Sequence, residues 1–370
     1  MRSSIIFIAL AICFLVLSSC KEPEPIRIGF LGELTTRAAG LSVSGRDGFL
    51  LAIEEANASG GINGRRVEGL VQDTREHEGA ALQAVHTLAA SGVSAIIGPM
   101  TSQTAVTIVP EINQAKIPMV SPTVSTNQLS GLDDYFFRVY YTNAQAAKLL
   151  AGKLLLQKNV RRIAIIYDLG NRAYTEDWIR HFQVALEQGG GSLIIRIPFD
   201  FHSDTLFLDL ATQAAEANPQ GLLILANAVD TAMICQQLAK IGADLPRYAT
   251  GWSYSDDLIQ FGGKSVEGLT IIRSADLQDP APAMQNFVKA YQERFHNSPN
   301  FPALHAYEAT RMILAILEKT TDPQAIRREL LKLKQFSVIQ TDLSVDRFGD
   351  LKHPHLHLAH IKNGQFVKAD

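Results

Sequence analysis

Short apolar runs and longer amphipathic segments follow one another along most of this chain. Predominantly apolar runs at residues 26–31 and 95–98 predict buried strands, and apolar residues spaced three and four positions apart at 45–58 predict a helix. Further strands are expected at residues 67–71, 163–167, 193–197, 222–226 and 269–272 and near Tyr248, and further helices at 78–90, 102–115, 174–188, 205–217, 230–241, 284–295, 303–319 and 323–334. Strands that alternate with helices predict a parallel sheet with helices on both faces.

The alternation of strands and helices starts twice. The first series begins at residue 26 and the second at residue 163, and an additional hairpin is predicted at 356–367 with Asn363 and Gly364 at its turn. A chain of 370 residues also exceeds what one hydrophobic core usually serves. We therefore expect an α/β fold of two doubly wound parallel-sheet lobes.

The N-terminus has the pattern of a secretory leader. Arg2 precedes an apolar run at residues 5–17, which is shorter than the ~20 residues of a membrane span, and Leu17-Ser18-Ser19-Cys20 follows at once. These small residues before Cys20 resemble the lipobox of bacterial lipoproteins, in which the cysteine is acylated and becomes the new N-terminus. The alternative is an ordinary cleavage site beside an unrelated cysteine. The interpretation of residues 1–20 as a lipoprotein signal peptide makes 21–25, with two prolines, a short stiff tether.

Charge and cysteine content narrow the function classes. The net charge of -3 and the pI of about 6.4 give no basic excess for binding nucleic acid. Of the three cysteines, Cys13 leaves with the leader and Cys20 is the predicted lipidation site, so Cys235 alone remains and no internal disulfide is possible. Cys235 lies in an apolar part of a predicted helix, which favours a buried structural thiol over a nucleophile.

Two predicted strand ends are rich in hydroxyl groups. The strand at 95–98 runs into a segment that contains Met100 and Ser102, and residues 118–120 run into a segment that contains Thr123 and Ser125. Ligands of open α/β sheets bind at the carboxyl ends of strands, where helix N-termini offer free N–H groups. These residues therefore form a candidate carboxylate site. The alternative is that Ser102 and Ser125 only cap their helices.

Several motifs together resemble one family. They are Ile-Gly-Phe-Leu-Gly at 28–32, Gly-Arg-Asp-Gly at 45–48, Ala-Ile-Glu-Glu-Ala-Asn at 52–57, Gly-Gly-Ile-Asn-Gly-Arg at 60–65, Ala-Ile-Ile-Gly-Pro at 95–99 and Ile-Pro-Met-Val-Ser-Pro at 117–122. In this order they resemble type I periplasmic binding proteins, in the leucine/isoleucine/valine-binding branch of ABC-transporter receptors, over residues 26–367. The resemblance implies three chain crossings between a first lobe at 26–140 plus 275–335 and a second lobe at 141–274 plus 336–370. Closure of the lobes about this three-stranded hinge then traps a ligand.

The resemblance assigns roles to individual residues. Ser102 matches the serine that binds the ligand carboxylate, Ser125 its hydroxyl partner, and Thr123 a backbone carbonyl that faces the ligand ammonium. Tyr174 matches a tyrosine that reaches the ligand from the second lobe, although it could simply begin a helix. Leu41 falls in a loosely matched segment where the family places a residue over the ligand side chain. Met100 is included among the candidate contacts because it lies in the first strand-end segment.

One departure from the family concerns the ligand ammonium. Branched-chain amino-acid receptors place a glutamate after the strand near Tyr248, but residues 248–254 of this chain contain no acid. Because an unpaired buried charge is costly, either another acid substitutes or the ligand is not a simple α-amino acid. Asp230 and Asp168 follow other strands and are candidates, although Asp230 is equally suited to a helix N-cap. Trp252 is expected either to form the pocket floor or to line the core between the lobes.

The alternating His353, His355 and His357 are a possible zinc-binding pattern. On a strand they would share one face, but Leu356 and Leu358 would then face the core. We therefore expect a solvated histidine face and no metal site.

The leading functional hypothesis is a periplasmic, lipid-anchored receptor that delivers an amino acid or related small carboxylate to ABC permease subunits. The resemblance implies a monomer without cofactor. An envelope lipoprotein that binds and regulates a partner protein, or a ligand sensor, is the alternative. An enzyme is not expected, because the chain contains no Gly-x-Ser-x-Gly elbow and no phosphate-binding loop.

Replacement of Cys20 by alanine tests the predicted lipid anchor. Acylation with two or more chains gives stable membrane attachment, so Cys20→Ala should move the protein from the membrane fraction to the soluble extracytoplasmic fraction. Fractionation followed by immunoblotting measures this, with Cys235→Ala as the control. An unchanged membrane partition of Cys20→Ala would contradict the prediction.

Overall fold

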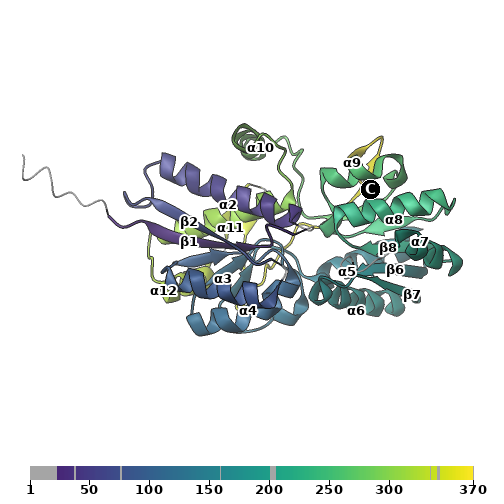
Figure 1. Ribbon diagram of the computed structural model, residues 1–370, viewed down its shortest axis with the longest axis horizontal. Coiled ribbons are helices and arrows are strands. Elements are labelled where there is room, and N and C mark those ends of the chain that lie inside the picture. The colour runs from purple at the N-terminus through teal and green to yellow at the C-terminus, as the bar shows by residue number, and fades with distance from the viewer. Residues whose placement is uncertain are drawn as a thin grey trace, which may run out of the picture.

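The computed structural model describes residues 23–36, 39–75, 77–158, 160–200, 206–333, 335–339 and 342–369. The predicted signal peptide, Cys20 and the first two tether residues lie outside this part of the chain. The described residues form two lobes that lie side by side along the long axis of the molecule (Figure 1). Within them, no helix is both long and apolar enough to cross a membrane.

The first lobe is a parallel five-stranded sheet in the order β2-β1-β3-β4-β5. Its strands are β1 (Ile26–Gly32), β2 (Val67–Asp73), β3 (Ala95–Ile97), β4 (Met119–Ser121) and β5 (Phe136–Arg138). Its helices are α2 (Gly40–Ala58), α3 (Glu78–Ala90), α4 (Ser102–Ala115), α10 (Pro282–Phe295), α11 (Phe301–Leu317) and α12 (Pro323–Lys332), with the 3₁₀ turn η1 (Asn127–Leu129). In Figure 1, α2 and α11 lie on one side of the strands and α3 and α4 on the other.

The second lobe is a seven-stranded sheet in the order β14-β13-β10-β9-β8-β6-β7. Its strands are β6 (Arg162–Asp168), β7 (Ser192–Phe199), β8 (Gly221–Leu225), β9 (Arg247–Ala249), β10 (Thr270–Arg273), β13 (His357–Lys362) and β14 (Gln365–Lys368). The helical elements around it are α5 (Asn143–Lys153), η2 (Leu154–Lys158), α6 (Arg172–Gln188), α7 (Phe207–Glu216), α8 (Ala228–Lys240), η3 (Gly251–Ser253), α9 (Asp256–Gly262) and η4 (Gly263–Val266). The fold class is thus confirmed, except that the predicted hairpin joins this sheet antiparallel and makes it mixed.

The chain passes between the two sheets three times. It leaves the first sheet after β5, returns after β10 to supply α10 to α12, and leaves again to form β13. A small two-stranded sheet, β11 (Phe336–Ser337) with β12 (Asp342–Leu343), lies in the last passage. The passages bring residues from distant parts of the sequence together between the lobes.

Close packing of α2 on α11 explains one glycine of the Gly-Arg-Asp-Gly motif. A Cβ atom added at Gly48 would lie 2.0 Å from the backbone oxygen of Ala303. Since no side chain fits at that distance, glycine allows the two helix backbones to approach and to hold the N-terminal half of α2 beside the sheet. Cys235 lies in the core of the other lobe and is fully buried, which raises the pKa of its thiol to about 12 and agrees with the predicted structural role.

A buried arginine joins three segments where the chain leaves the first sheet. Arg138, the last residue of β5, is completely buried, and its Nε donates to Oδ1 of Asp350 at 2.7 Å. Its Nη1 donates to the backbone oxygen of Thr126 at 2.9 Å, and its Nη2 to the hydroxyl of Ser130 at 3.0 Å. This network holds the segment after β4 against the last passage between the lobes.

Arg138→Met should lower the free energy of unfolding by about 3–5 kcal/mol, because it leaves the carboxylate of Asp350 without its buried partner. Urea denaturation followed by circular dichroism measures this change. Arg27→Met is the matched control. Arg27 pairs with Glu68 at the surface, with 41% of its side chain exposed, so its loss should change stability by only about 0–1 kcal/mol. Equal effects of the two substitutions would contradict the assigned role of Arg138.

Candidate functional site

The two hydroxyl-rich segments lie at adjacent strand ends of the first lobe. β3 and β4 are neighbours in the sheet, and their carboxyl ends lead into α4 and into residues 122–126. The helix caps are Thr101, which accepts from the N–H of Thr104, and Thr126, which accepts from the N–H of Gln128. Ser102 and Ser125 therefore do not serve as the caps that the alternative interpretation proposed.

Ser102 instead connects the two segments. Its Oγ accepts from the backbone N–H groups of Ser125 and Thr126, each at 3.3 Å. Thr123 is fixed in the same place, because its hydroxyl donates to the backbone oxygen of Met100 at 2.5 Å. The hydroxyl hydrogen of Ser102 is not used in these bonds, so this side chain offers a hydrogen-bond donor at the N-terminus of α4.

A small cavity lies between the lobes against these segments. Its lining residues are Leu41, Met100, Ser102, Thr123, Ser125, Tyr140, Tyr141, Asn171, Tyr174, Trp252 and Phe301. The structure therefore brings seven of the eight predicted contacts together, all except Asp230. The volume of about 20 Å³ is enough for one water molecule, so side chains fill most of this space.

Tyr174 enters the cavity from the second lobe, near the start of α6. Its hydroxyl donates to Oγ1 of Thr250 at 2.6 Å, and its ring meets that of Trp252 edge to face with the centroids 5.5 Å apart. Burial raises the pKa of Tyr174 well above its usual value, so the phenol is neutral. Thr250 itself is fully buried and directly follows β9.

Four lining residues were not predicted from the sequence. Tyr140 and Tyr141 lie in the first passage between the lobes, with their hydroxyl oxygens 3.1 Å apart, and Phe301 stacks on Tyr140 at 5.8 Å. Asn171 lies in the turn before α6. The local sequence gives the tyrosines little signal, since they follow Phe136-Phe137-Arg138-Val139, in which a charge interrupts the apolar residues. Nothing in the local sequence marks Phe301 or Asn171, because distant segments bring them to the site.

Asp230 does not reach this cavity. Asn227 is the N-cap of α8, and its Oδ1 accepts from the N–H of Asp230 while its Nδ2 donates to Oδ2 of Asp230 at 2.7 Å. Asp230 is thus the third residue of the helix, fully buried and bound to the cap. Asp168 lies instead in a larger cleft, where its Oδ1 accepts from the N–H of Gly170 at 2.8 Å.

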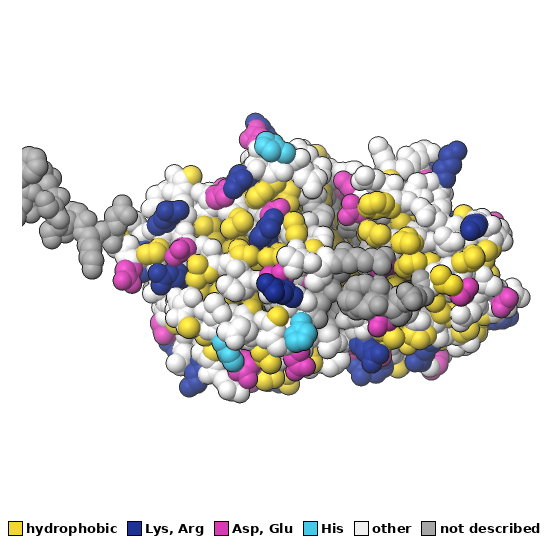
Figure 2. Space-filling view, in the orientation of Figure 1, with side chains coloured by type: hydrophobic (Ala, Val, Ile, Leu, Met, Phe, Trp, Pro, Cys, Tyr) yellow, Lys and Arg dark blue, Asp and Glu magenta, His cyan; other side chains and the backbone are white. Residues whose placement is uncertain are grey.

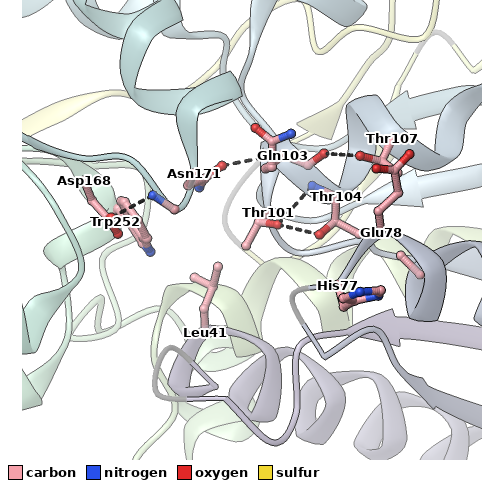
Figure 3. Close-up of a pocket in the computed structure, with 12 residues that line it drawn as sticks. Leu41, His77, Glu78, Thr101, Gln103, Thr104, Thr107, Asp168, Asn171 and Trp252 are labelled. Carbon is pink, nitrogen blue, oxygen red and sulfur yellow. Dashed lines mark hydrogen bonds between the residues drawn. The ribbon is translucent and has the colours of Figure 1, made fainter. Parts of the chain in front are cut away.

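That larger cleft, of about 240 Å³, shares Leu41, Asn171 and Trp252 with the cavity. Figure 3 shows Asp168, Asn171 and Trp252 on one side and Thr101, Gln103 and Thr104 on the other. Two hydrogen bonds join the lobes in this cleft. The N–H of Gln103 donates to Oδ1 of Asn171 at 3.0 Å, and the N–H of Ala173 donates to Oε1 of Gln103 at 3.2 Å.

Leu41 and Trp252 separate the cavity from its surroundings. Both line the cavity, the larger cleft and a third hollow of about 110 Å³. They come from different lobes, Leu41 from α2 and Trp252 from η3. A ligand that enters from either side must therefore pass these two side chains.

A buried acid that the sequence did not predict lies beside the cleft. Glu33 is 1% exposed, and its Oε1 accepts from the hydroxyls of Thr101 and Thr104 at 2.8 and 2.6 Å. Its Oε2 accepts from the hydroxyl of Ser42 at 2.9 Å. Three hydroxyl donors thus satisfy the carboxylate, and it fixes α2 and the start of α4 relative to β1.

The three alternating histidines do not form a joint strand face. Only His357 belongs to β13, and the rings of His355 and His357 are 6.3 Å apart. In the part of the chain that the structure describes, no group of three or more His, Cys, Asp or Glu side chains is arranged to hold a metal ion.

Acidic and basic side chains are scattered over both lobes on the face drawn in Figure 2.

Comparison with known proteins gives consistent matches over almost the whole chain. The Leu/Ile/Val-binding protein homolog 3 of Brucella melitensis is 24% identical over 353 residues, covering 92% of this chain and 93% of that protein. A branched-chain amino acid transporter substrate-binding protein of Streptococcus pneumoniae, in complex with isoleucine, has a TM-score of 0.84 at 21% identity and covers 93% of this chain and 100% of that one. A solute-binding protein of R. palustris, in complex with benzoate, has a TM-score of 0.82 at 16% identity, with 93% and 95% covered.

A family model supplies the assignment. The model described as periplasmic binding protein matches residues 25–363, which include the first lobe, all three passages and the second lobe up to the turn before β14. The curated relatives and the solved structures agree with this match over nearly their full lengths. The chain therefore belongs to the periplasmic binding protein family.

Proposed function

We propose that this chain is an extracytoplasmic, lipid-anchored receptor of an ABC importer that closes its two lobes around a small carboxylate. The observation that carries the proposal is the cavity between the lobes, where Ser102 and Ser125 of one lobe face Tyr174 of the other. Relatives described as Leu/Ile/Val-binding proteins support the receptor role. The permease partner is inferred from these relatives. The lipid anchor is inferred from the predicted lipobox before Cys20.

The first lobe suits the carboxylate end of a ligand. The N-terminus of α4 carries a partial positive charge, and the hydroxyl of Ser102 adds a donor. Hydrogen bonds from Ser125 and Thr126 to Ser102 fix the geometry before a ligand arrives. A preformed set of donors lowers the entropy lost on binding, which favours affinity without a basic side chain.

Lobe closure provides the mechanism. A ligand that contacts both lobes binds the closed arrangement more tightly than the open one, so it shifts the population toward the closed state. The closed arrangement already has bonds of its own, from Gln103 to Asn171 and from the N–H of Asn127 to Oδ2 of Asp177 at 2.8 Å. Permease subunits then have a distinct shape to recognise when a ligand is bound.

Removal of the two serine hydroxyls tests the site. A thermal-shift screen of the mature protein, without lipid, against amino acids, amides, small carboxylates and sugars should give a clear shift with one class. Ser102→Ala combined with Ser125→Ala should abolish that shift, because both hydroxyl groups that face the carboxylate are lost. Circular dichroism checks that the fold is intact, and Ser91→Ala, at the end of α3, is the matched control. Undiminished affinity of the double variant would refute the site, and a flat screen would favour the partner-binding alternative.

Asn171→Ala tests the closure. This change removes one acceptor across the cleft, which is worth about 1 kcal/mol and thus reduces the closed-to-open ratio about fivefold. Small-angle scattering of the protein without ligand should give a larger radius of gyration than for the wild type. Gln188→Ala, at the exposed end of the same helix, should leave the radius unchanged. An Asn171→Ala protein as compact as the control would show that this bond does not hold the lobes together.

A further inference from the structure

The cavity contains polar groups but no charge. Of the described residues that line it, none is an Asp, Glu, Lys, Arg or His. Its polar side chains are three hydroxyl residues of the first lobe, three phenols and the amide of Asn171. Burial raises the pKa of Tyr140, Tyr141 and Tyr174 above the usual value, so all three phenols are neutral at physiological pH. A ligand cation in this cavity has no counter-charge.

Two of these phenols fill the space directly after β9. Branched-chain amino-acid receptors place a glutamate after this strand, but this chain has no acid there. A Cβ atom added at Gly251 would lie 2.5 Å from the hydroxyl oxygen of Tyr141 and 2.9 Å from that of Tyr140. Thr250, the other residue at this strand end, uses its side chain to accept from Tyr174. Hydroxyl groups therefore occupy the position from which a carboxylate could reach a ligand ammonium.

The buried carboxylates near the cavity accept hydrogen bonds from groups outside it. Glu33 accepts from three hydroxyls, Asp230 is bound by the side chain of Asn227, and Asp177 accepts from Nδ2 of Asn143 at 2.8 Å. Asp168 lines the adjoining cleft, where it accepts from the N–H of Gly170. None of the four lines the cavity. Burial of an ammonium group without a paired acid loses much of its solvation energy. The site therefore discriminates against a zwitterionic amino acid.

The remaining lining is rich in aromatic rings. Five of its eleven residues are aromatic, namely Tyr140, Tyr141, Tyr174, Trp252 and Phe301. The rings of Tyr140 and Tyr141 lie 4.1 Å apart, and Phe301 stacks on Tyr140, so these faces cover one another rather than stand open to a cation. Edge-to-face and stacked contacts with such rings favour an aromatic ligand.

We infer that the ligand is a monocarboxylate with an aromatic body and without an ammonium group. This inference rests on the proposed receptor function and specifies the substrate class of the same site. The carboxylate lies at the N-terminus of α4 beside Ser102, and the ring lies among Tyr174, Trp252 and Phe301. Because the closed cavity has a volume of only about 20 Å³, Leu41 and Trp252 move aside as the lobes close around the ligand.

Matched ligand pairs test the inference. The mature protein is titrated by calorimetry with 3-phenylpropanoate and with phenylalanine, which differ only by the ammonium group, and with 4-methylpentanoate and leucine as the aliphatic pair. Glycine betaine is included as a cation that aromatic rings could bind. We expect 3-phenylpropanoate to bind most tightly and phenylalanine at least about tenfold more weakly.

A charge introduced at the strand end supplies a second test. Thr250→Glu places a carboxylate where the hydroxyl of Tyr174 can donate to it, and it should increase the affinity for phenylalanine at least about tenfold while weakening that for 3-phenylpropanoate. Thr250→Gln is the matched neutral control and should not gain phenylalanine binding. If neither variant folds, as judged by circular dichroism, the ligand pairs measured on the wild type decide alone.

The outcomes separate the two proposals. Binding of phenylalanine, leucine or glycine betaine as tightly as 3-phenylpropanoate would overturn this inference and leave the receptor function standing. Tighter binding of 4-methylpentanoate than of 3-phenylpropanoate would overturn the aromatic part. Binding of no compound in these series or in the wider screen would overturn the receptor function itself, and the inference with it.

Discussion

The buried guanidinium group of Arg138 is the interaction on which the geometry between the lobes depends. It links the end of β5 to Asp350 in the last passage and to the backbone oxygen of Thr126. Thr126 and Ser125 in turn donate from their N–H groups to Ser102. One fully buried charge thus connects the last passage between the lobes to the segment that faces the cavity. Because a buried charge tolerates little displacement from its partners, this network fixes that segment relative to the passage.

The two lobes contribute differently to the site. The first lobe supplies the small hydroxyl side chains of Ser102, Thr123 and Ser125, together with the apolar side chains of Leu41, Met100 and Phe301. The second lobe supplies the rings of Tyr174 and Trp252, which contact each other, and the first passage supplies that of Tyr140, which contacts Tyr141 and Phe301. Polar recognition is therefore built in advance on one side, whereas the apolar part of the site is completed when the lobes come together.

Most strands and helices were predictable from the sequence, because buried parallel strands form continuous apolar runs and their covering helices are amphipathic. α3 and α4 begin and end at the predicted residues. No strand or helix was predicted at the first passage, where the short strand β5 and the helix α5 depend on tertiary contacts rather than on local pattern. The hydroxyl-rich strand ends were recognisable for a related reason, since the carboxyl ends of neighbouring parallel strands must lie together. Phe301 and Asn171 could not be found in this way, because they come from segments far away in the sequence.

The absence of a side chain at Gly251 limits which substitutions this site can accept. Its missing side chain leaves room for two hydroxyl groups, those of Tyr140 and Tyr141. A residue larger than glycine fits there only if both hydroxyls are absent or displaced, so substitutions at these three positions are strongly non-additive. A larger residue at position 251 alone meets a steric barrier, so a different chemistry at this strand end requires the tyrosines to change first or together with it. The chemistry of this strand end is therefore protected against change by packing, independently of any contact with a ligand.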